Sequence, residues 1–153
     1  MRLLLLVSLA LTIVIAGCTT QEPVVVKDNH VPFRVLSEGT TSGWTQQKLL
    51  TLRSAREFTE FWGVHRNGNL GNLPKINFKK QMVIAVCMGE RRTGGYAIQI
   101  KNIINAQKAL LVDVVVTRPR PGSTRIMMIN QPHMVVVLPR IDKAVKFKLR
   151  SGQ

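Results

Sequence analysis

The sequence predicts an α+β domain: a mainly antiparallel β-sheet, or a small barrel or sandwich, with one α-helix packed on it. Short apolar segments recur along the chain between turns rich in Gly, Pro, Asn and Ser, a spacing typical of β-strands. One helix signal interrupts them, at residues 54–65. The chain has 153 residues, 45% hydrophobic and 20% charged, which favours a single globular domain.

The helix signal begins with a capping box. Ser54 and Glu57 have the spacing at which the serine hydroxyl accepts from the Glu57 backbone N–H and the glutamate reaches back. An apolar stripe at helical spacing follows, and it consists of Phe58, Phe61, Trp62 and His65. Such a stripe is typical of a buried helix face. We therefore expect a helix at about 54–65 that packs on the sheet and carries no ligand site on its aromatic face.

The expected strands follow the apolar segments, at residues 33–36, 44–52, 82–87, 95–104, 109–117, 126–129, 133–138 and 145–149. The continuous apolar run at 82–87 predicts a strand buried on both faces, and the alternation at 95–104 predicts one buried face. Residues 37–43 (SEGTTSG) are expected to form a loop. Residues 118–123 (RPRPGS) cannot lie inside a regular strand, because each proline removes a donor from the ladder.

The N-terminal sequence predicts a lipid anchor. Arg2 precedes an apolar run at residues 3–16, which is short for a membrane span and suits a signal sequence. The run ends in Ile-Ala-Gly-Cys at residues 15–18, which resembles a bacterial lipobox. We expect Cys18 to be lipidated. The alternative is a soluble secreted protein in which Cys18 stands at this position by coincidence.

A lipid anchor at this position divides the chain into a lipoprotein signal peptide, a lipidated cysteine with its tether, and one β-rich domain, at residues 1–17, 18–32 and 33–150. Several acyl chains together hold a protein firmly at a bilayer. Thr19 follows the cysteine, and by resemblance to lipoproteins without aspartate there we expect an outer-membrane lipoprotein of the cell envelope. The side of that membrane stays open.

The net charge narrows the choice of partners. The formal value is +14, which indicates nucleic acid, an anionic membrane surface or an acidic protein. An exported protein seldom meets nucleic acid, so we expect none as a partner. The membrane surface lies beside the expected anchor, and we interpret the basic excess first as electrostatics near it. The alternative is a solvated basic surface.

We find no catalytic or metal-binding pattern in the sequence. His30, His65 and His133 do not have the spacing of zinc ligands, and nucleophile-elbow and thiol-protease signatures are missing. With Cys18 lipidated, Cys87 has no disulfide partner within the chain, and its apolar neighbours predict an inert buried thiol. We therefore expect that the protein is not an enzyme and that it binds no metal and no cofactor.

Residues 89–100 read GERRTGGYAIQI and combine charge, mobility and an aromatic ring. Arg91 and Arg92 can bind carboxylates bidentately. The pair Gly94-Gly95 permits a positive φ or the close approach of another backbone, and Tyr96 is an amphipathic residue that interfaces favour. A strand rather than a helix follows, so the stretch is not a phosphate loop. It forms either a surface shaped for a partner or a glycine-rich hairpin or bulge with Tyr96 packed inward.

Several motifs belong together: FTEFW at 58–62, INFKK at 76–80, MVIAVCMGERRTGGYAIQI at 82–100, RPRPG at 118–122, QPH at 131–133 and VVLPR at 136–140. Over about residues 45–140 they resemble the PrcB C-terminal domain family, whose namesake is a lipoprotein subunit of a bacterial surface protease complex. Asn77 departs from the pattern, where we expect aspartate. The resemblance implies a non-catalytic domain that binds an exported protease or another envelope protein, as an accessory subunit.

The expected partner-binding residues form two segments, and these are Arg91, Arg92, Thr93, Gly94, Gly95 and Tyr96, with Arg118, Pro119, Arg120, Pro121 and Gly122. A second resemblance is to chagasin-like inhibitors of cysteine peptidases, which plug an active-site cleft with a Thr-Thr-Gly-Tyr/Phe loop and an Arg-Pro loop. The alternative function is therefore a peptidase inhibitor that acts through the TGGY and RPRPG loops. It requires the two loops to lie side by side at one end of the fold.

Overall fold

The computed structural model describes residues 29–124 and 126–152. The expected signal peptide, Cys18 and most of the tether lie outside this part of the chain. The elements in chain order are β1 (Arg34–Gly39), β2 (Lys48–Leu52), α1 (Ala55–His65), β3 (Gln81–Cys87), β4 (Arg91–Thr93), β5 (Ala97–Asn105), β6 (Ala109–Thr117), β7 (Met127–Asn130), β8 (His133–Pro139) and β9 (Ala144–Gly152). Within the described ranges, no helix has the length and apolarity needed to cross a membrane.

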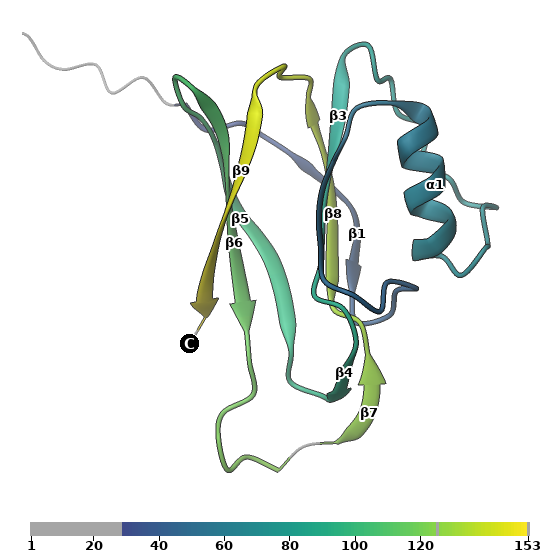
Figure 1. The fold of residues 1–153 in the computed structure, drawn as a ribbon, viewed down its shortest axis with the longest axis vertical. Coiled ribbons are helices and arrows are strands. Elements are labelled where there is room, and N and C mark those ends of the chain that lie inside the picture. Colours follow the sequence, from purple (N-terminus) through teal and green to yellow (C-terminus); the bar gives the residue numbers. More distant parts are fainter. Residues whose placement is uncertain (1–28, 125, 153) are drawn as a thin grey trace, which may run out of the picture.

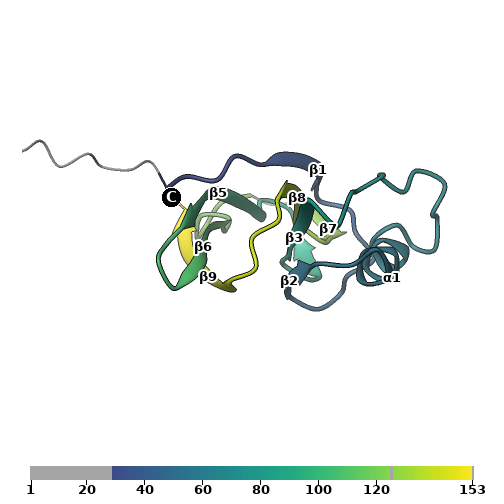
Figure 2. The same ribbon diagram turned by 90° about the horizontal axis from the view of Figure 1, so that it is seen from above.

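These elements form three layers (Figures 1 and 2). The middle layer is a four-stranded antiparallel sheet in the order β1-β8-β3-β2. The sheet β5-β6-β9 covers one of its faces and α1 covers the other. Strands β4 and β7 form a separate two-stranded ribbon at one end. The predicted α+β class with one helix is confirmed, and the sheets do not close into a barrel.

Strands β3 and β8 occupy the centre of the middle sheet and are buried on both faces. Successive side chains of a strand point to opposite faces. The side chains of β3 alternate between two cores. Met82, Ile84 and Val86 lie in the core beneath the second sheet, and Val83, Ala85 and Cys87 lie in the core beneath the helix. Because both faces need apolar residues, the sequence of β3 is a continuous apolar run rather than an alternating one.

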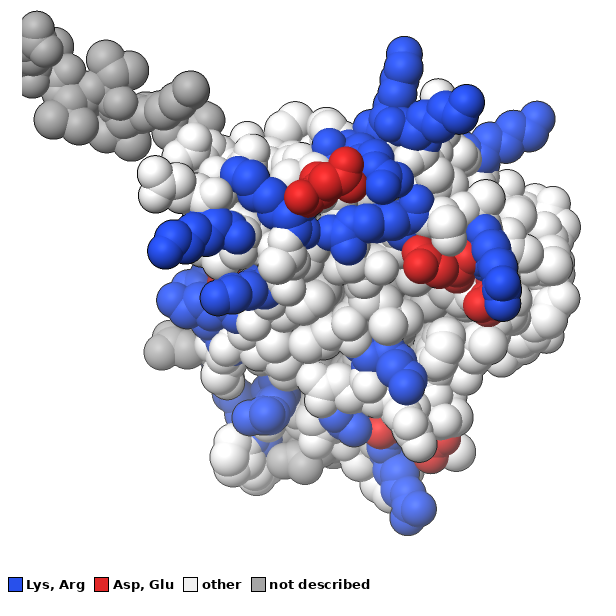
Figure 3. Space-filling view, turned by 45° about the horizontal axis from the view of Figure 1, so that its top comes forward, with Lys and Arg blue, Asp and Glu red and all other residues white. Residues whose placement is uncertain are grey.

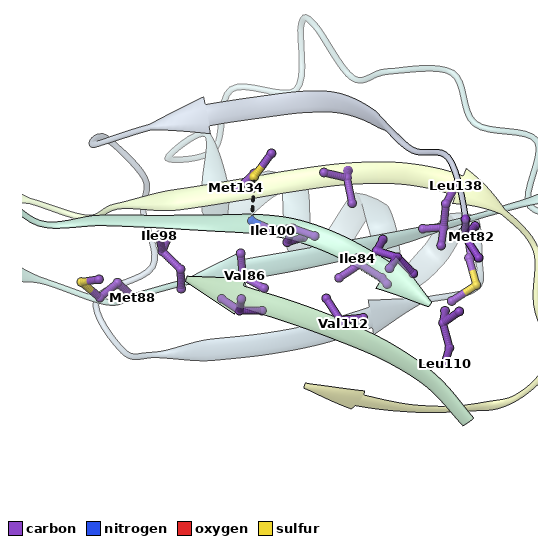
Figure 4. Close-up of a cluster of buried hydrophobic side chains, with 14 residues drawn as sticks. Met82, Ile84, Val86, Met88, Ile98, Ile100, Leu110, Val112, Met134 and Leu138 are labelled. Carbon is purple, nitrogen blue, oxygen red and sulfur yellow. Dashed lines mark hydrogen bonds between the residues drawn. The ribbon is translucent and has the colours of Figure 1, made fainter. Parts of the chain in front are cut away.

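Figure 4 shows the core between the two sheets. Ile98 and Ile100 from β5 meet Leu110 and Val112 from β6 over the apolar face of β3 and β8. The backbone N–H of Ile100 donates to Sδ of Met134 at 3.1 Å. A β8 side chain thus satisfies a donor of β5, which is an edge strand of its own sheet.

Helix α1 begins and packs as its sequence predicts. Ser54 Oγ accepts from the backbone N–H of Glu57, and the Glu57 carboxylate accepts from the backbone N–H of Ser54. These two hydrogen bonds confirm the capping box. The predicted stripe of three aromatic residues and His65 is buried against the middle sheet.

Three features differ from expectation. The loop expected at 37–43 begins later, because Ser37–Gly39 continue β1 and pair with His133–Val135 after a bulge. Strand β4 was not expected, since three residues are too short for a periodic signal. Strand β9 pairs with β6 in parallel, because the chain leaves the second sheet through β7 and β8 before it returns.

The first described residues join the second sheet. The N–H of Asn105 donates to the carbonyl of Asn29 at 2.8 Å, and the N–H of Val31 donates to the carbonyl of Ile103 at 2.8 Å. His30 forms an isolated bridge with Ile104. The chain therefore enters the domain beside the hairpin between β5 and β6, at the end opposite the β4-β7 ribbon (Figure 1).

Candidate functional site

Both segments predicted to bind a partner lie at one end of the molecule, around the ribbon of β4 and β7 (Figure 1). Arg91 pairs with Asn130 and Thr93 with Met127, with an irregularity between the two pairs. We call this end the tip and define it as residues 91–96, 118–124 and 126–130. It consists of the TGGY loop, the RPRPG loop and β7.

Gly95 is the point where the two loops meet. Its φ of +87° lies in the region that favours glycine. A Cβ atom at this position would lie 2.9 Å from Cβ of Pro119, which is too close for two carbon atoms. The N–H of Gly94 donates to the carbonyl of Ile126 at 3.0 Å. The neighbour that the glycine pair admits therefore belongs to the same chain.

Tyr96 points toward the core rather than into solvent. It is half-buried and packs on the cluster between the two sheets. The guanidinium carbon of Arg91 lies 5.7 Å from the centroid of its ring, within cation–π range, and Arg91 also donates to the carbonyl of Glu90 at 2.8 Å. Tyr96 and Arg91 therefore hold the base of the tip, as in the inward-packed interpretation of the sequence.

The remaining arginines of the tip face solvent. Arg92, Arg118 and Arg120 are exposed. The RPRPG loop turns back at Gly122, whose φ is +75°, and the hydroxyl of Ser123 donates to the carbonyl of Arg120 at 2.7 Å. The loop thus carries two cationic side chains on a hydrogen-bonded turn beside β7.

Strand β7 and the residue before it form an apolar surface that sequence reasoning did not single out. Ile126, Met127, Met128 and Ile129 are 74%, 79%, 50% and 64% exposed. Hollows of about 340 and 370 Å³ lie beside this segment. The first is lined by Gly94, Gly95, Pro119, Ser123, Thr124, Ile126 and Met128, and the second by Glu90, Arg92, Met127, Met128 and Ile129. Both faces of the strand are therefore open.

Asn130 fastens the base of this exposed strand. Its Nδ2 donates to the carbonyl of Thr93 at 2.7 Å and to that of Met128 at 3.3 Å. The side chain is buried, so these bonds are shielded from competing water. The apolar residues beyond it are consequently held out from the domain rather than folded back onto it.

The composition of the tip is that of a protein interface. Interfaces are enriched in methionine and arginine, contiguous exposed apolar residues mark interaction sites, and methionine adapts to irregular surfaces. The sequence contains a weak signal for this, because an unalternating apolar run follows a proline-rich loop. The same run is equally typical of a buried strand, and only its place beyond the sheets distinguishes the two.

A second polar cluster lies inside the domain, between α1, β1 and β8. Ser37 Oγ lies 3.1 Å from Nε2 of His65 and 3.0 Å from Nε2 of His133. Ser42 Oγ lies 3.0 Å from Nδ1 of His65. The imidazole rings are 4.5 Å apart between centroids, and both are buried.

The contacts of this cluster form one continuous hydrogen-bonded chain when both histidines are neutral. The carbonyl of Gln131 can only accept, so Nδ1 of His133 donates to it at 3.3 Å and Nε2 of a neutral ring must accept. The Ser37 hydroxyl therefore donates to His133 and accepts from Nε2 of His65. Nδ1 of His65 then accepts from the Ser42 hydroxyl. A proton added to either ring would turn a serine hydroxyl from donor to acceptor and interrupt this chain, and it would place a positive charge on a buried ring.

Burial also favours the neutral form of both histidines. It lowers the pKa of His65 from 6.5 to about 4, with the neighbouring His133 contributing, and it also lowers the pKa of His133. In the described part of the chain, no three residues among His, Cys, Asp and Glu are grouped to hold a metal ion. We interpret the cluster as a structural hydrogen-bond network that holds the helix on the middle sheet.

Cys87 is equally enclosed. Its side chain is buried within β3 against α1. Burial raises the pKa of the thiol to about 12, so the nucleophilic thiolate does not form near neutral pH.

Residues 82–139 match the family described as PrcB C-terminal. This segment is therefore similar to the PrcB C-terminal family. The matched segment begins in β3 and ends in β8, and is shorter than the 45–140 expected from motifs. It contains the tip, whereas α1, β1, β2 and β9 lie outside the PrcB C-terminal match. No curated protein and no solved structure matches the chain.

Gly95→Ala should destabilise the domain by about 1–3 kcal/mol, because alanine is strained at positive φ and its Cβ would collide with Pro119. Gly94→Ala is the matched control. An added Cβ there has its nearest contact at 3.8 Å, with the carbonyl of Ile126, so a change within about 0.5 kcal/mol is expected. Urea unfolding followed by tryptophan fluorescence measures both. Equal stability of the two variants would contradict the packing of the loops.

The free energy of unfolding should fall as the pH is lowered from about 6.5 toward 4. The folded-state pKa of His65 is below its ordinary value, so the unfolded chain binds the proton first and stability is lost on acidification. The loss from His65 alone should reach about 2 kcal/mol at pH 5. Urea titrations from pH 7.5 to 5 measure it.

The control for the pH dependence is a pair of variants. His65→Gln with His133→Gln should flatten the dependence between pH 7 and 5, whereas His30→Gln changes an exposed histidine outside the cluster and should retain it. A wild-type chain whose stability is constant over this range would contradict the neutral hydrogen-bonded chain.

Proposed function

We propose that the chain is a lipid-anchored lipoprotein of the cell envelope, held at the outer membrane through Cys18, whose domain binds another exported protein through the tip. The partner is an exported protease or another envelope protein, and the domain acts as an accessory subunit. The match of residues 82–139 to the PrcB C-terminal family supports a role connected with a protease complex. The observation that carries the proposal is the exposed apolar segment 126–129 between solvent-facing arginines.

The chemistry of the tip defines the surface it fits. Four consecutive apolar residues open on both sides need a cleft or a strand edge that covers them. Arg92, Arg118 and Arg120 surround this segment and suit carboxylates at the rim of such a cleft. The partner surface is therefore an apolar groove with an acidic border.

The domain acts by binding rather than by catalysis. Its histidine pair is buried and engaged in a hydrogen-bonded chain that suits neutral rings. Its thiol is buried with a raised pKa. His65 and Cys87 are enclosed. His133 lines a hollow of about 330 Å³ beside β1 and β5, but both of its ring nitrogens are engaged in hydrogen bonds. This arrangement supports a non-enzymatic role and a site without metal or cofactor.

Peptidase inhibition is the second candidate. It requires the TGGY and RPRPG loops to lie side by side, and the contact between Gly95 and Pro119 meets this requirement. In this case the tip would enter the active-site cleft of the peptidase. The two candidates share one surface and differ in what binding does to the activity of the partner.

A photoreactive amino acid in place of Met127, in the lipidated chain in its native membrane, should capture one envelope protein. Val64 on α1 is the matched control, because it is an apolar residue with 44% exposure outside the residues that define the tip, and a photoreactive residue there should not capture that protein. Products that are identical at both positions, or that consist of lipid alone, would overturn the proposal.

Two further measurements complete this test. Met127→Asp with Ile129→Asp should weaken capture at least tenfold, since central interface residues dominate affinity, and should leave folding intact because both side chains are exposed. The proteolytic activity of the captured partner is then measured with and without the chain. Increased activity identifies an accessory subunit, and lost activity identifies an inhibitor.

A further inference from the structure

The end of the domain opposite the tip carries a dense cluster of lysine and arginine side chains. Figure 3 turns this end toward the viewer and shows positive side chains spread across it with few acidic ones between them. We call it the basic end. It consists of Arg53, Lys79, Lys80, Lys108, Arg140, Lys143 and Lys146.

Hydrogen bonds hold the loops of the basic end together. The backbone N–H of Arg140 donates to the carbonyl of Lys80 at 2.9 Å, and its Nη1 donates to the carbonyl of Arg53 at 3.1 Å. Nη2 of Arg53 donates to the carbonyl of Lys143 at 2.7 Å. Nζ of Lys143 donates to Oδ1 of Asn105 at 2.7 Å. The cluster is therefore a fixed feature of the fold.

The local carboxylates do not neutralise this charge. Asp142 pairs with Arg140 at 3.0 Å, and Glu57 accepts from the backbone N–H of Arg53 at 2.7 Å. Lys79, Lys80, Lys108 and Lys146 are exposed, and they keep the net charge of this end strongly positive.

The chain enters the domain at the basic end. Asn29 accepts from the backbone N–H of Asn105, the residue whose side chain binds Lys143. Residues 1–28, with the apolar run and Cys18, join the domain at this point. From Cys18 to Asn29 the chain can span at most roughly 40 Å. Whatever surface holds Cys18 therefore lies within reach of the basic end.

The composition of the basic end fits a charged surface better than a protein partner. Interface cores are depleted in lysine and need apolar anchors. The loops of this end, at residues 75–80, 105–108 and 139–143, contribute none of the large exposed apolar side chains of the described chain. Lysines without an apolar centre suit an anionic lipid surface, which attracts each nearby cation without needing a shaped pocket.

We propose that the basic end rests on the anionic surface of the bilayer that holds Cys18, and that this contact directs the tip away from the membrane. The proposal depends on the lipid anchor of the proposed function. It assigns the two ends different partners: anionic lipid headgroups for the lysines, and a protein for the apolar segment of the tip. The domain stands upright on its membrane rather than rotating freely on its tether.

The test measures orientation on the full lipidated chain. A fluorophore is placed on Gln107→Cys, which is exposed beside the basic end, or on Ser123→Cys, which is exposed at the tip. Vesicles contain nitroxide headgroup lipid as quencher, in phosphatidylcholine with or without phosphatidylglycerol. Anionic lipid should raise quenching at position 107 at least twofold and leave position 123 little changed. Salt at 1 M should remove the difference, because the Debye length falls to about 3 Å.

Charge variants distinguish a contact made by the basic end from an effect of the net charge of the whole chain. Lys80→Glu with Lys108→Glu should abolish the quenching at position 107, whereas Arg66→Glu with Lys148→Glu, of equal charge and outside the basic end, should retain it. Equal quenching at positions 107 and 123, or equal quenching in neutral and anionic vesicles, would overturn the proposal.

Lipidation of Cys18 is tested separately from the orientation of the domain. Mass spectrometry of the chain from cells reports whether Cys18 carries lipid, and absence of the lipid would overturn the anchor while leaving orientation open to measurement. An unlipidated chain is then held by an N-terminal polyhistidine tag on nickel-chelating lipid, and the same quenching comparison decides whether the basic end lies on the bilayer.

Discussion

The pairing of β3 with β8 is the interaction on which the rest of the structure depends. Both strands are buried on both faces, so their side chains build the core under α1 and the core under β5 and β6. The paired ends of these two strands also determine where the tip begins. Cys87 and His133 lie opposite each other in the register, and the N–H of Met88 donates to the carbonyl of Pro132 at 2.8 Å. Strands β4 and β7 extend from this one closed corner.

The corner separates a rigid platform from an exposed ribbon. The neutral histidine cluster ties α1 to β1 and β8 just behind it, and Tyr96 and Asn130 close its base. Beyond that point the ribbon exposes its apolar residues to water, which is unfavourable in the isolated domain and would be relieved by the partner that we propose. The basic end, at the other extreme, carries charge without an apolar centre. The molecule is thus polarised along its long axis.

The sequence could predict what depends on local pattern. The continuous run of β3, the capping box at Ser54 and the aromatic stripe of α1 each follow from neighbouring residues, and the structure confirms them. Strand β4 and the parallel pairing of β9 depend on partners far along the chain. The glycine pair and the RPRPG loop were singled out, yet the apolar residues of β7 between them were not, because pattern alone cannot distinguish exposed from buried strands.

Hydrogen exchange followed by mass spectrometry most directly tests the claim that the tip is the partner-binding surface. The lipidated chain is compared in its native envelope fraction and after purification away from other proteins. Backbone amides of residues 91–95 and 126–130 should exchange at least tenfold more slowly in the envelope, while those of α1 and β9 stay unchanged. Protection confined to α1 or β9, with the tip exchanging equally fast in both samples, would contradict the account.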